Sequence, residues 1–261
     1  GGLSLLATGQ QNPAQIINST IVDNVFNDPN SEGKTAGLIL ERGSYAHLLN
    51  SIVYSEQFPI VTLGNYDIEG PAELTVSYSL IYEGQDSIDV NAESTLNWEF
   101  GNIIANPDFV DNSGGDYHLL SSSLSINGGH PDSLDGDGTR ADIGFYAYLN
   151  SYTGPNWYVG ESGNDLTATG ASDDPFRSIQ AALNFGSDGD TAFVSAGTYN
   201  ENLVYRRDES ESIRNVSLVG ESTESTIIDG QDEGICIKFP MNGYSSPLVK
   251  GFTLRNGYAN G

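Results

Sequence analysis

Residues 18–24 read NSTIVDN, and related phrases return as NSIVYS at 50–55 and YSLIYE at 78–83. Each phrase begins with a polar or aromatic residue and continues into two or three β-branched or apolar residues. Such residues fit the pleated, half-buried surface of a β-strand. The three phrases therefore predict one short strand that returns at a regular interval.

The spacing of these phrases predicts a solenoid. Val22 to Val53 is 31 residues, and Val53 to Ile81 is 28. A second apolar run precedes each phrase: GLSLLAT at 2–8, AGLILER at 36–42 and PIVTLGN at 59–65. A period near 30 that contains at least two short strands is typical of a stacked repeat architecture.

The phrase GFTLRNG at 251–257 resembles the same strand. When residue 1 is counted as following residue 261, Leu254 to Val22 is 29 residues, which falls between the two internal steps. This spacing predicts that the sequence is cut inside a coil. Three earlier phrases of the same kind are SIRNVSLVGE at 212–221, STIIDG at 225–230 and GICIKF at 234–239.

One segment favours an α-helix over about 174–185. Asp174 fits the N-cap, Pro175 the first helical position, and Gly186 the stop. The apolar face consists of Phe176, Ile179, Ala182 and Leu183. Because a solenoid exposes strand edges at its ends, we expect this helix to cap the coil that starts at TAFVSAGTY, residues 191–199.

Composition excludes several classes of partner. The chain has 261 residues, 38% of them hydrophobic, and a net charge of −25, which repels nucleic acid and anionic membranes. No apolar run approaches the roughly 20 residues of a membrane helix, so we expect no membrane insertion. Cys236 is the only cysteine, which excludes an intrachain disulfide.

Two long segments carry a family resemblance. Residues 156–203 begin NWYVGESGNDLTATGASDDPFRSIQ, and residues 101–148 begin GNIIANPDFVDNSGGDYHLL. They resemble, respectively, the N-terminal and C-terminal sections of the right-handed parallel β-helix (pectate-lyase-like) superfamily in its modular, secreted bacterial form. The resemblance implies an all-β, right-handed parallel β-helix solenoid with one short capping α-helix, at an extracellular or cell-surface location of bacterial type.

This chain departs from the family in the order of its parts. We expect residues 1–150 to form the C-terminal part of a β-helix, 151–156 a linker, and 157–261 the N-terminal part with its capping helix. A closing motif that precedes an opening motif implies a circular permutant, an excised tandem repeat or one subunit of a polymer.

The densest polar cluster is HPDSLDGDGTRADIG at 130–144. Alternating aspartate and glycine can direct several oxygens at one hard cation, which predicts a Ca²⁺ site, although the match to a calcium-binding loop is partial. The candidate ligands are Asp132, Asp135, Asp137 and Asp142. Alternatively, the Asp-Gly pairs form turns, and Asp142 pairs with Arg140 or caps backbone amides.

The sequence offers no catalytic constellation, and we assign no catalytic residue. Polysaccharide lyases of the resembling fold combine acidic calcium ligands with a basic residue, but Lys34, Lys238 and Lys250 lie in no recognisable catalytic phrase. The three histidines are too far apart in the sequence to indicate a zinc site. They are His47, His118 and His130.

Two functions fit these patterns. The first is a structural repeat module of an extracellular fibre or adhesin, whose copies bind one another head to tail and complete one another's β-helix; such contact is heterologous and can continue without closure. In this case the partner is a further copy of the chain. The alternative is a secreted polysaccharide-binding or polysaccharide-lyase β-helix domain, whose partners are glycans.

Overall fold

The structure is a computed structural model that describes residues 2–6, 12–24, 37–56, 60–64, 70–206, 214–240 and 247–259. The chain divides into two compact units. Unit 1 comprises Gly1–His118 and Leu124–Ala147, and unit 2 comprises Leu119–Ser123 and Tyr148–Gly261.

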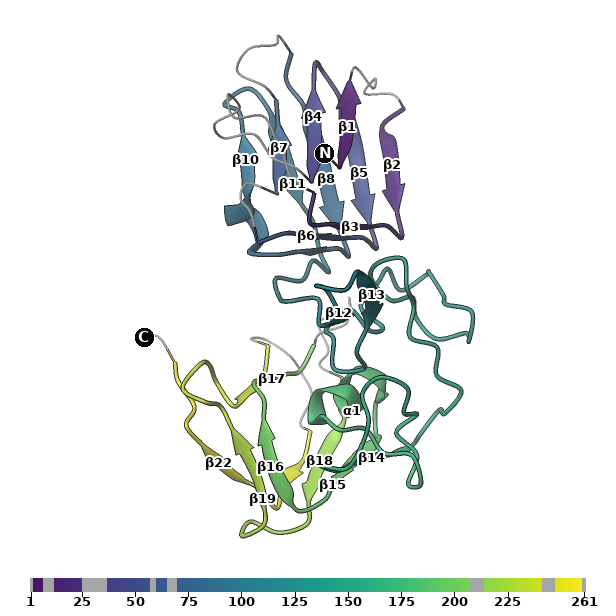
Figure 1. Ribbon diagram of the computed structural model, residues 1–261, viewed down its shortest axis with the longest axis vertical. Helices are drawn as coiled ribbons and strands as arrows, with labels where there is room; N and C mark the ends of the chain where they lie inside the picture. Colours follow the sequence, from purple (N-terminus) through teal and green to yellow (C-terminus); the bar gives the residue numbers. More distant parts are fainter. Residues whose placement is uncertain are drawn as a thin grey trace. The chain divides into compact units, whose positions relative to one another are not determined.

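Unit 1 is built from three parallel sheets that the chain visits in turn (Figure 1). The first sheet contains β1 (Leu3–Leu6), β4 (Leu38–Glu41), β7 (Val61–Leu63) and β10 (Ile88–Val90). The second contains β2 (Ala14–Ile17), β5 (Tyr45–Leu49), β8 (Glu73–Ser77) and β11 (Thr95–Trp98). The third contains β3 (Thr20–Val22), β6 (Ile52–Tyr54) and β9 (Leu80–Ile81). Unit 1 also contains the 3₁₀ helix η1 (Gly84–Ser87) and the paired strands β12 (Phe109–Asp111) and β13 (Asp116–Leu119), although Leu119 itself belongs to unit 2.

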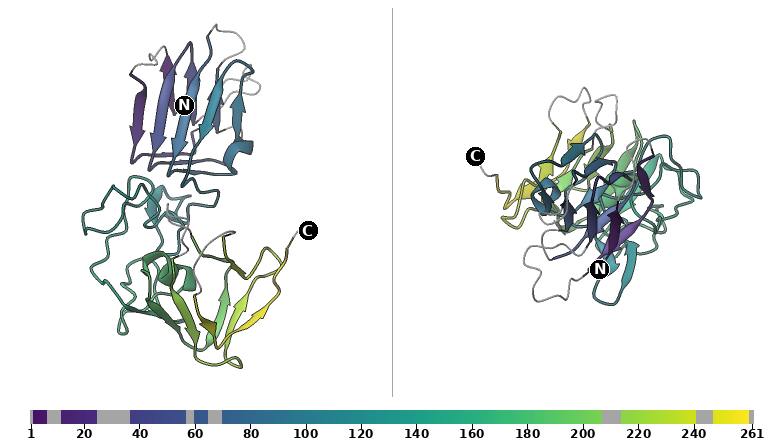
Figure 2. Two further views of the ribbon diagram at one scale, coloured as in Figure 1. Left: turned by 180° about the vertical axis from the view of Figure 1, so that it is seen from behind. Right: turned by 90° about the horizontal axis from the view of Figure 1, so that it is seen from above.

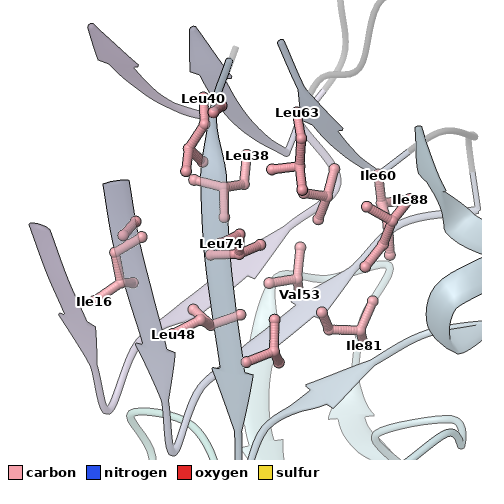
Figure 3. Close-up of a cluster of buried hydrophobic side chains, with 14 residues drawn as sticks. Ile16, Leu38, Leu40, Leu48, Val53, Ile60, Leu63, Leu74, Ile81 and Ile88 are labelled. Atoms are coloured by element: carbon pink, nitrogen blue, oxygen red, sulfur yellow. The ribbon is translucent and has the colours of Figure 1, made fainter. Parts of the chain in front are cut away.

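Period-two alternation in these strands forms the core of unit 1. In β5 and β8 every second side chain is buried, as the burial of Ala46, Leu48 and Leu74 shows. Side chains from all three sheets point toward one another in the interior (Figure 3). Because each sheet buries one face inside the coil, the strand phrases fold only as a stack. The expected all-β parallel β-helix with one short α-helix is therefore confirmed.

The predicted strands are confirmed, but the spacing between the first two differs by one residue from the prediction. Val53 pairs with Ile81, as the 28-residue step predicts. Val53 also pairs with Ile21 and not with Val22, so the first step is one residue longer than the expected 31. The error arose because Ile21 and Val22 are both β-branched and the sequence pattern does not distinguish which of them points inward.

A ladder of side-chain hydrogen bonds joins successive coils at the corner between the second and third sheets. The Ser19 amide donates to Ser51 Oγ at 3.0 Å, and the Ser51 amide donates to Ser79 Oγ at 3.2 Å. The Ser79 amide in turn donates to Asn102 Oδ1 at 3.1 Å. These bonds supply partners for backbone groups that the tight corner removes from the sheets.

The ladder predicts that Ser51→Ala destabilises unit 1. Ser51 is fully buried, and its hydroxyl donates to Leu49 O at 2.8 Å while it accepts from Ser19. Leaving buried groups without a partner costs roughly 1–3 kcal/mol. Urea denaturation should show this loss for Ser51→Ala and almost none for Ser4→Ala, whose side chain is exposed on β1. Equal midpoints for the two variants would rule out a stabilising ladder.

Unit 2 repeats the same architecture, and Figure 2 shows its strands from two further directions. The first sheet contains β14 (Asn156–Val159), β15 (Thr191–Val194), β18 (Ser217–Gly220) and β21 (Val249–Lys250). The second contains β16 (Gly197–Asn200), β19 (Thr226–Asp229) and β22 (Thr253–Arg255). The third contains β17 (Leu203–Val204) and β20 (Ile237–Lys238).

The helix is shorter than predicted. α1 spans Ile179–Phe185 with Ser178 at the N-cap and Gly186 at the C-cap, so the predicted stop is correct and the predicted start at Asp174 is wrong. The Asp174 carboxylate accepts the Thr169 amide at 2.9 Å and closes a turn instead. Phe176 forms a parallel bridge with Val159, which holds the chain extended before the helix.

An aromatic stack packs α1 against the start of unit 2. The ring centroid of Trp157 on β14 lies 6.0 Å from that of Phe185 on α1 and 6.2 Å from that of Phe176. The interplanar angles are 29° and 13°, so the rings are stacked. The Trp157 indole donates to Asp190 Oδ2 at 2.8 Å. β14 pairs with β15 and precedes α1, so the first strand of this stack lies before the helix and not after it, contrary to the expected start at residue 191.

Candidate functional site

Within the residues that the structure describes, the sheets of each unit end in strands that have a sheet partner on one side only. In unit 2 they include the last coil, formed by β20, β21 and β22, each of which is the final member of its sheet. All three residues of β22 are exposed, and Leu254, whose sheet neighbour Ile228 is buried, is 50% exposed. An unpaired strand edge with apolar side chains is a template for a further strand.

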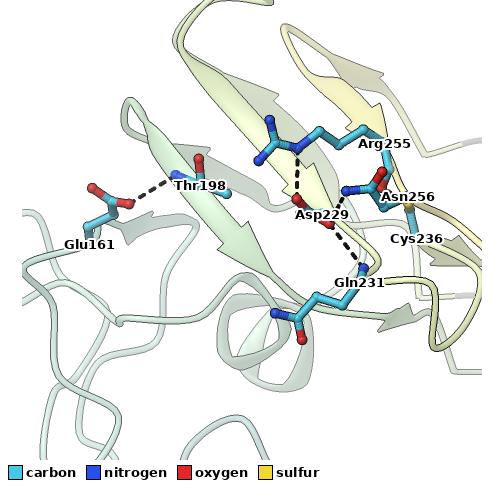
Figure 4. A network of polar contacts seen from close by, with 7 residues as sticks. All are labelled: Glu161, Thr198, Asp229, Gln231, Cys236, Arg255 and Asn256. Atoms are coloured by element: carbon cyan, nitrogen blue, oxygen red, sulfur yellow. Dashed lines mark hydrogen bonds and ion pairs between the residues drawn. The ribbon is translucent and has the colours of Figure 1, made fainter.

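A polar network holds the last coil in place (Figure 4). Arg255 Nε donates to Asp229 Oδ2 at 2.7 Å, and Asn256 Nδ2 donates to Asp229 Oδ1 at 3.0 Å. The Gln231 amide also donates to Oδ1 at 3.0 Å. These hydrogen bonds lower the pKa of Asp229 below its ordinary value, and the bond from the Gln231 amide has the largest effect. The edge that β22 presents is therefore fixed by the coil before it.

The first coil of unit 1, formed by β1, β2 and β3, lies at the opposite end of its stack. β1, β2 and β3 are each the terminal member of a sheet. Leu3 and Leu5 pack on the core but remain partly exposed, and Ile17 is 46% exposed. A parallel solenoid adds coils in one direction only, so the first coil of one stack has the polarity needed to follow the last coil of another.

The acidic loop uses its predicted metal ligands to organise its own backbone. Asp142 is buried, and its Oδ1 accepts the Asn127 amide at 2.6 Å while its amide donates to Asp135 Oδ2 at 2.8 Å. Asp137 Oδ1 accepts the Thr139 amide at 3.0 Å. The structure thus brings Asp135 and Asp142 together through backbone groups.

The fourth predicted ligand, Asp132, is exposed, and its amide donates to His130 Nδ1 at 3.2 Å. Burial raises the pKa of Asp135 above its ordinary value. Among the residues that the structure describes, no group of three or more histidine, cysteine or acidic side chains is placed to hold a metal ion. Calcium binding stays a prediction, which calorimetric titration of the chelator-treated chain with CaCl₂ tests.

The two lysines that the structure describes lie on different strands. Lys238 is on β20 and Lys250 on β21, both exposed, and Lys34 falls outside the described residues.

No helix in the described parts of the chain is long and apolar enough to cross a membrane.

An open groove of about 460 Å³ lies on the outward face of the first sheet of unit 2. Tyr158 and Phe193 occupy opposite positions on β14 and β15, with ring centroids 5.7 Å apart and an interplanar angle of 25°. Val219 continues this row on β18. Glu221 also lines the groove, and its Oε2 accepts the Ala196 amide at 2.9 Å. The groove offers a stacked aromatic surface beside one carboxylate.

Comparison with known proteins connects one part of unit 2 to a family. A family described as "Protein of unknown function (DUF1565)" matches residues 161–235. That family is associated with parallel β-helix proteins. The match covers α1 and the strands from β15 to β19. The search of curated proteins and the search of solved structures found no match. The comparison therefore supports the parallel β-helix fold.

The matched segment contains two carboxylates that bind the start of α1. Asp165 Oδ1 accepts the amides of Arg177 and Ser178 at 2.9 and 3.1 Å. Glu201 accepts the amides of Ile179 and Gln180 at 2.8 and 2.9 Å. Neither contact is predictable from the local sequence pattern, because each carboxylate lies more than ten residues from the start of the helix that it caps. Figure 4 shows a similar contact, in which Glu161 accepts the Thr198 amide at 2.9 Å.

Glu201 should make the stability of unit 2 depend on pH. Burial raises its pKa from 4.5 to about 7 against the opposing effect of the two helix amides. A carboxyl group with a raised folded-state pKa contributes stability below its unfolded pKa, and this contribution is lost as pH rises through the folded pKa. We expect unit 2 of the wild type to lose about 3 kcal/mol between pH 4.5 and pH 7.

Glu201→Gln tests this expectation because it mimics the protonated form. Urea denaturation at several pH values should show that the variant lacks the decline over this window. Parallel stability curves for wild type and variant would show that the Glu201 pKa is not raised.

Proposed function

We propose that this chain is a structural repeat module of an extracellular fibre or adhesin, in which copies join head to tail. The last coil of unit 2 in one copy is continued by the first coil of unit 1 in the next. One observation supports this most directly: the two units leave strand edges and half-exposed apolar residues at opposite ends of their coil stacks.

The physical basis is the free energy gained when these strand edges and apolar side chains are covered. Burying a leucine fully contributes roughly 1.5–3 kcal/mol, and pairing a strand edge supplies backbone hydrogen bonds along its length. A contact between two different surfaces of identical copies is heterologous and generates a linear assembly when its rotation does not close. The net charge of −25 keeps such an assembly soluble away from its ends.

Negative-stain electron microscopy tests the assembly directly. At high protein concentration and moderate salt, which screens the repulsion between acidic copies, we expect linear particles with a uniform repeat. A field of single, compact particles under all conditions would contradict the proposal and would favour a closed arrangement within one molecule.

A second candidate function is polysaccharide binding on the groove of unit 2. It is supported by the stacked pair Tyr158 and Phe193, because aromatic faces offer apolar area to sugar rings and lose little conformational entropy. The acidic surface favours neutral over anionic polysaccharides. In affinity electrophoresis against a panel of soluble glycans, Phe193→Ala should remove any retardation that the wild type shows; unretarded wild type on every glycan would reject this candidate.

A further inference from the structure

The chain turns through a tight corner at Asn18 in unit 1 and through a similar corner at Gly251 in unit 2. We propose that β21–β22 of one copy pair in register with β2–β3 of the next, with Gly251 opposite Asn18 and Leu254 opposite Ile21. The inference rests on the head-to-tail function proposed above and specifies its register.

The first support is backbone conformation. In unit 1, Asn18 and Asp23 have positive φ angles of 49° and 46° on either side of β3. In unit 2, Gly251 and Asn256 have positive φ angles of 79° and 51° on either side of β22. The two pairs have the same spacing in sequence.

The same pair of corners occurs inside unit 1, where Tyr78 and Glu83 have φ angles of 46° and 59° around β9. Residues other than glycine rarely adopt this region, so the left-handed residues of unit 1 and Asn256 of unit 2 are distinctive. The β21–β22, β2–β3 and β8–β9 segments therefore share the same spacing of left-handed residues, with one before and one after the second strand.

The second support is the direction of the side chains. Aligning Gly251 with Asn18 places Val249 opposite Ile16, and both positions continue inward rows: Val249 pairs with buried Leu218, and Ile16 pairs with buried Leu48. A shift by one residue would turn every side chain to the wrong face.

The strands that follow the two corners, β22 and β3, obey the same register. Leu254 pairs with buried Ile228 in unit 2, and Ile21 pairs with buried Val53 in unit 1. The alignment thus joins two inward rows into one. In this register Leu254 lies opposite Ile21 and not opposite Val22. This agrees with unit 1, where Ile21 and not Val22 pairs with Val53.

The third support is the serine ladder. Ser51 and Ser79 each donate their hydroxyl to the carbonyl two residues earlier and accept an amide from the coil before. Ser19 donates in the same way, to Ile17 O at 3.0 Å. In the proposed register the residue that faces Ser19 is Phe252, whose amide takes the place of the next amide in the ladder.

The backbone pattern extends likewise. Within unit 1 the Ile52 amide donates to Ser19 O at 2.8 Å, and the Leu80 amide donates to Ser51 O at 2.9 Å. By the same rule the Thr20 amide of the following copy donates to Phe252 O. The junction therefore reproduces the corner of unit 1 in both its side-chain and its backbone hydrogen bonds.

Disulfide trapping tests the register. Lys250 is exposed on β21, and Ile17, its partner in this register, is exposed on β2. Paired residues on adjacent parallel strands lie about 4.8 Å apart, which a disulfide spans. We expect a mixture of Lys250→Cys and Ile17→Cys chains to give a disulfide-linked dimer under mild oxidation. The buried Cys236 is present in all samples, so wild type is the background control.

The matched control is Gln15→Cys, which lies on the same exposed face two residues away. Position 15 lies about 6.6 Å along the strand from position 17, and this displacement prevents efficient linkage to a cysteine at position 250. Preferential linkage of Gln15→Cys, or association in the ultracentrifuge without linkage of the Ile17 pair, overturns the register and leaves the head-to-tail function intact. Absence of association by wild type overturns both.

Discussion

Leu254→Asp should strongly weaken head-to-tail association and leave the chain folded. Leu254 is 50% exposed in the isolated unit and would be buried against Ile21 at the junction. The variant loses roughly 1.5–3 kcal/mol of burial and places an unpaired carboxylate in an apolar contact, which costs more. We expect the association constant to fall by at least about 100-fold, measured by sedimentation velocity over a concentration series.

Leu166→Asp is the matched control. Leu166 also belongs to unit 2 and is 48% exposed, but it lies outside the last coil. Both variants add one negative charge, so a difference between them reports position. Equal weakening by the two substitutions would show that charge, and not the edge of β22, controls association.

Leu74→Ala should cause a large loss of stability in unit 1. Leu74 on β8 is completely buried, with β5 on one side and β11 on the other. Replacing a buried leucine with alanine typically costs about 2–5 kcal/mol, because apolar contacts are lost and a cavity remains. Hydrogen exchange followed by mass spectrometry should show this loss in peptides from β5 and β8.

Leu134→Ala removes the same atoms from the surface of unit 1, where the side chain is 66% exposed. Surface substitutions of this kind usually change stability by less than about 0.5 kcal/mol. If amide hydrogen exchange in peptides from β5 and β8 were equally fast in Leu74→Ala and Leu134→Ala, the interior of unit 1 would not be packed as the solenoid requires.

The fold of this chain was predictable because its strand phrases recur at intervals close to one coil. The exact phase was not predictable, since adjacent β-branched residues such as Ile21 and Val22 satisfy either orientation. The start of α1 was mispredicted for a related reason: Asp174 and Pro175 are good helix-start residues, but the bridge between Phe176 and Val159 gives this segment another partner. Tertiary pairing overrides local preference in both cases.

The candidate site was predictable only in outline. Repeated strands imply exposed edges, and the spacing of GFTLRNG indicated a partner near Val22. The network around Asp229 was missed, although Arg255 lies directly opposite Asp229 in the sheet. Only the register of the coils brings such distant charges together. The aromatic pair Tyr158 and Phe193 was missed because its two members lie on strands separated by α1.

Sedimentation equilibrium over a wide range of protein concentration tests the central claim most directly. If copies continue one another's coils, the weight-average mass will rise with concentration through multiples of 27.9 kDa without reaching a closed limit. A mass that stays at 27.9 kDa at every concentration would contradict the account.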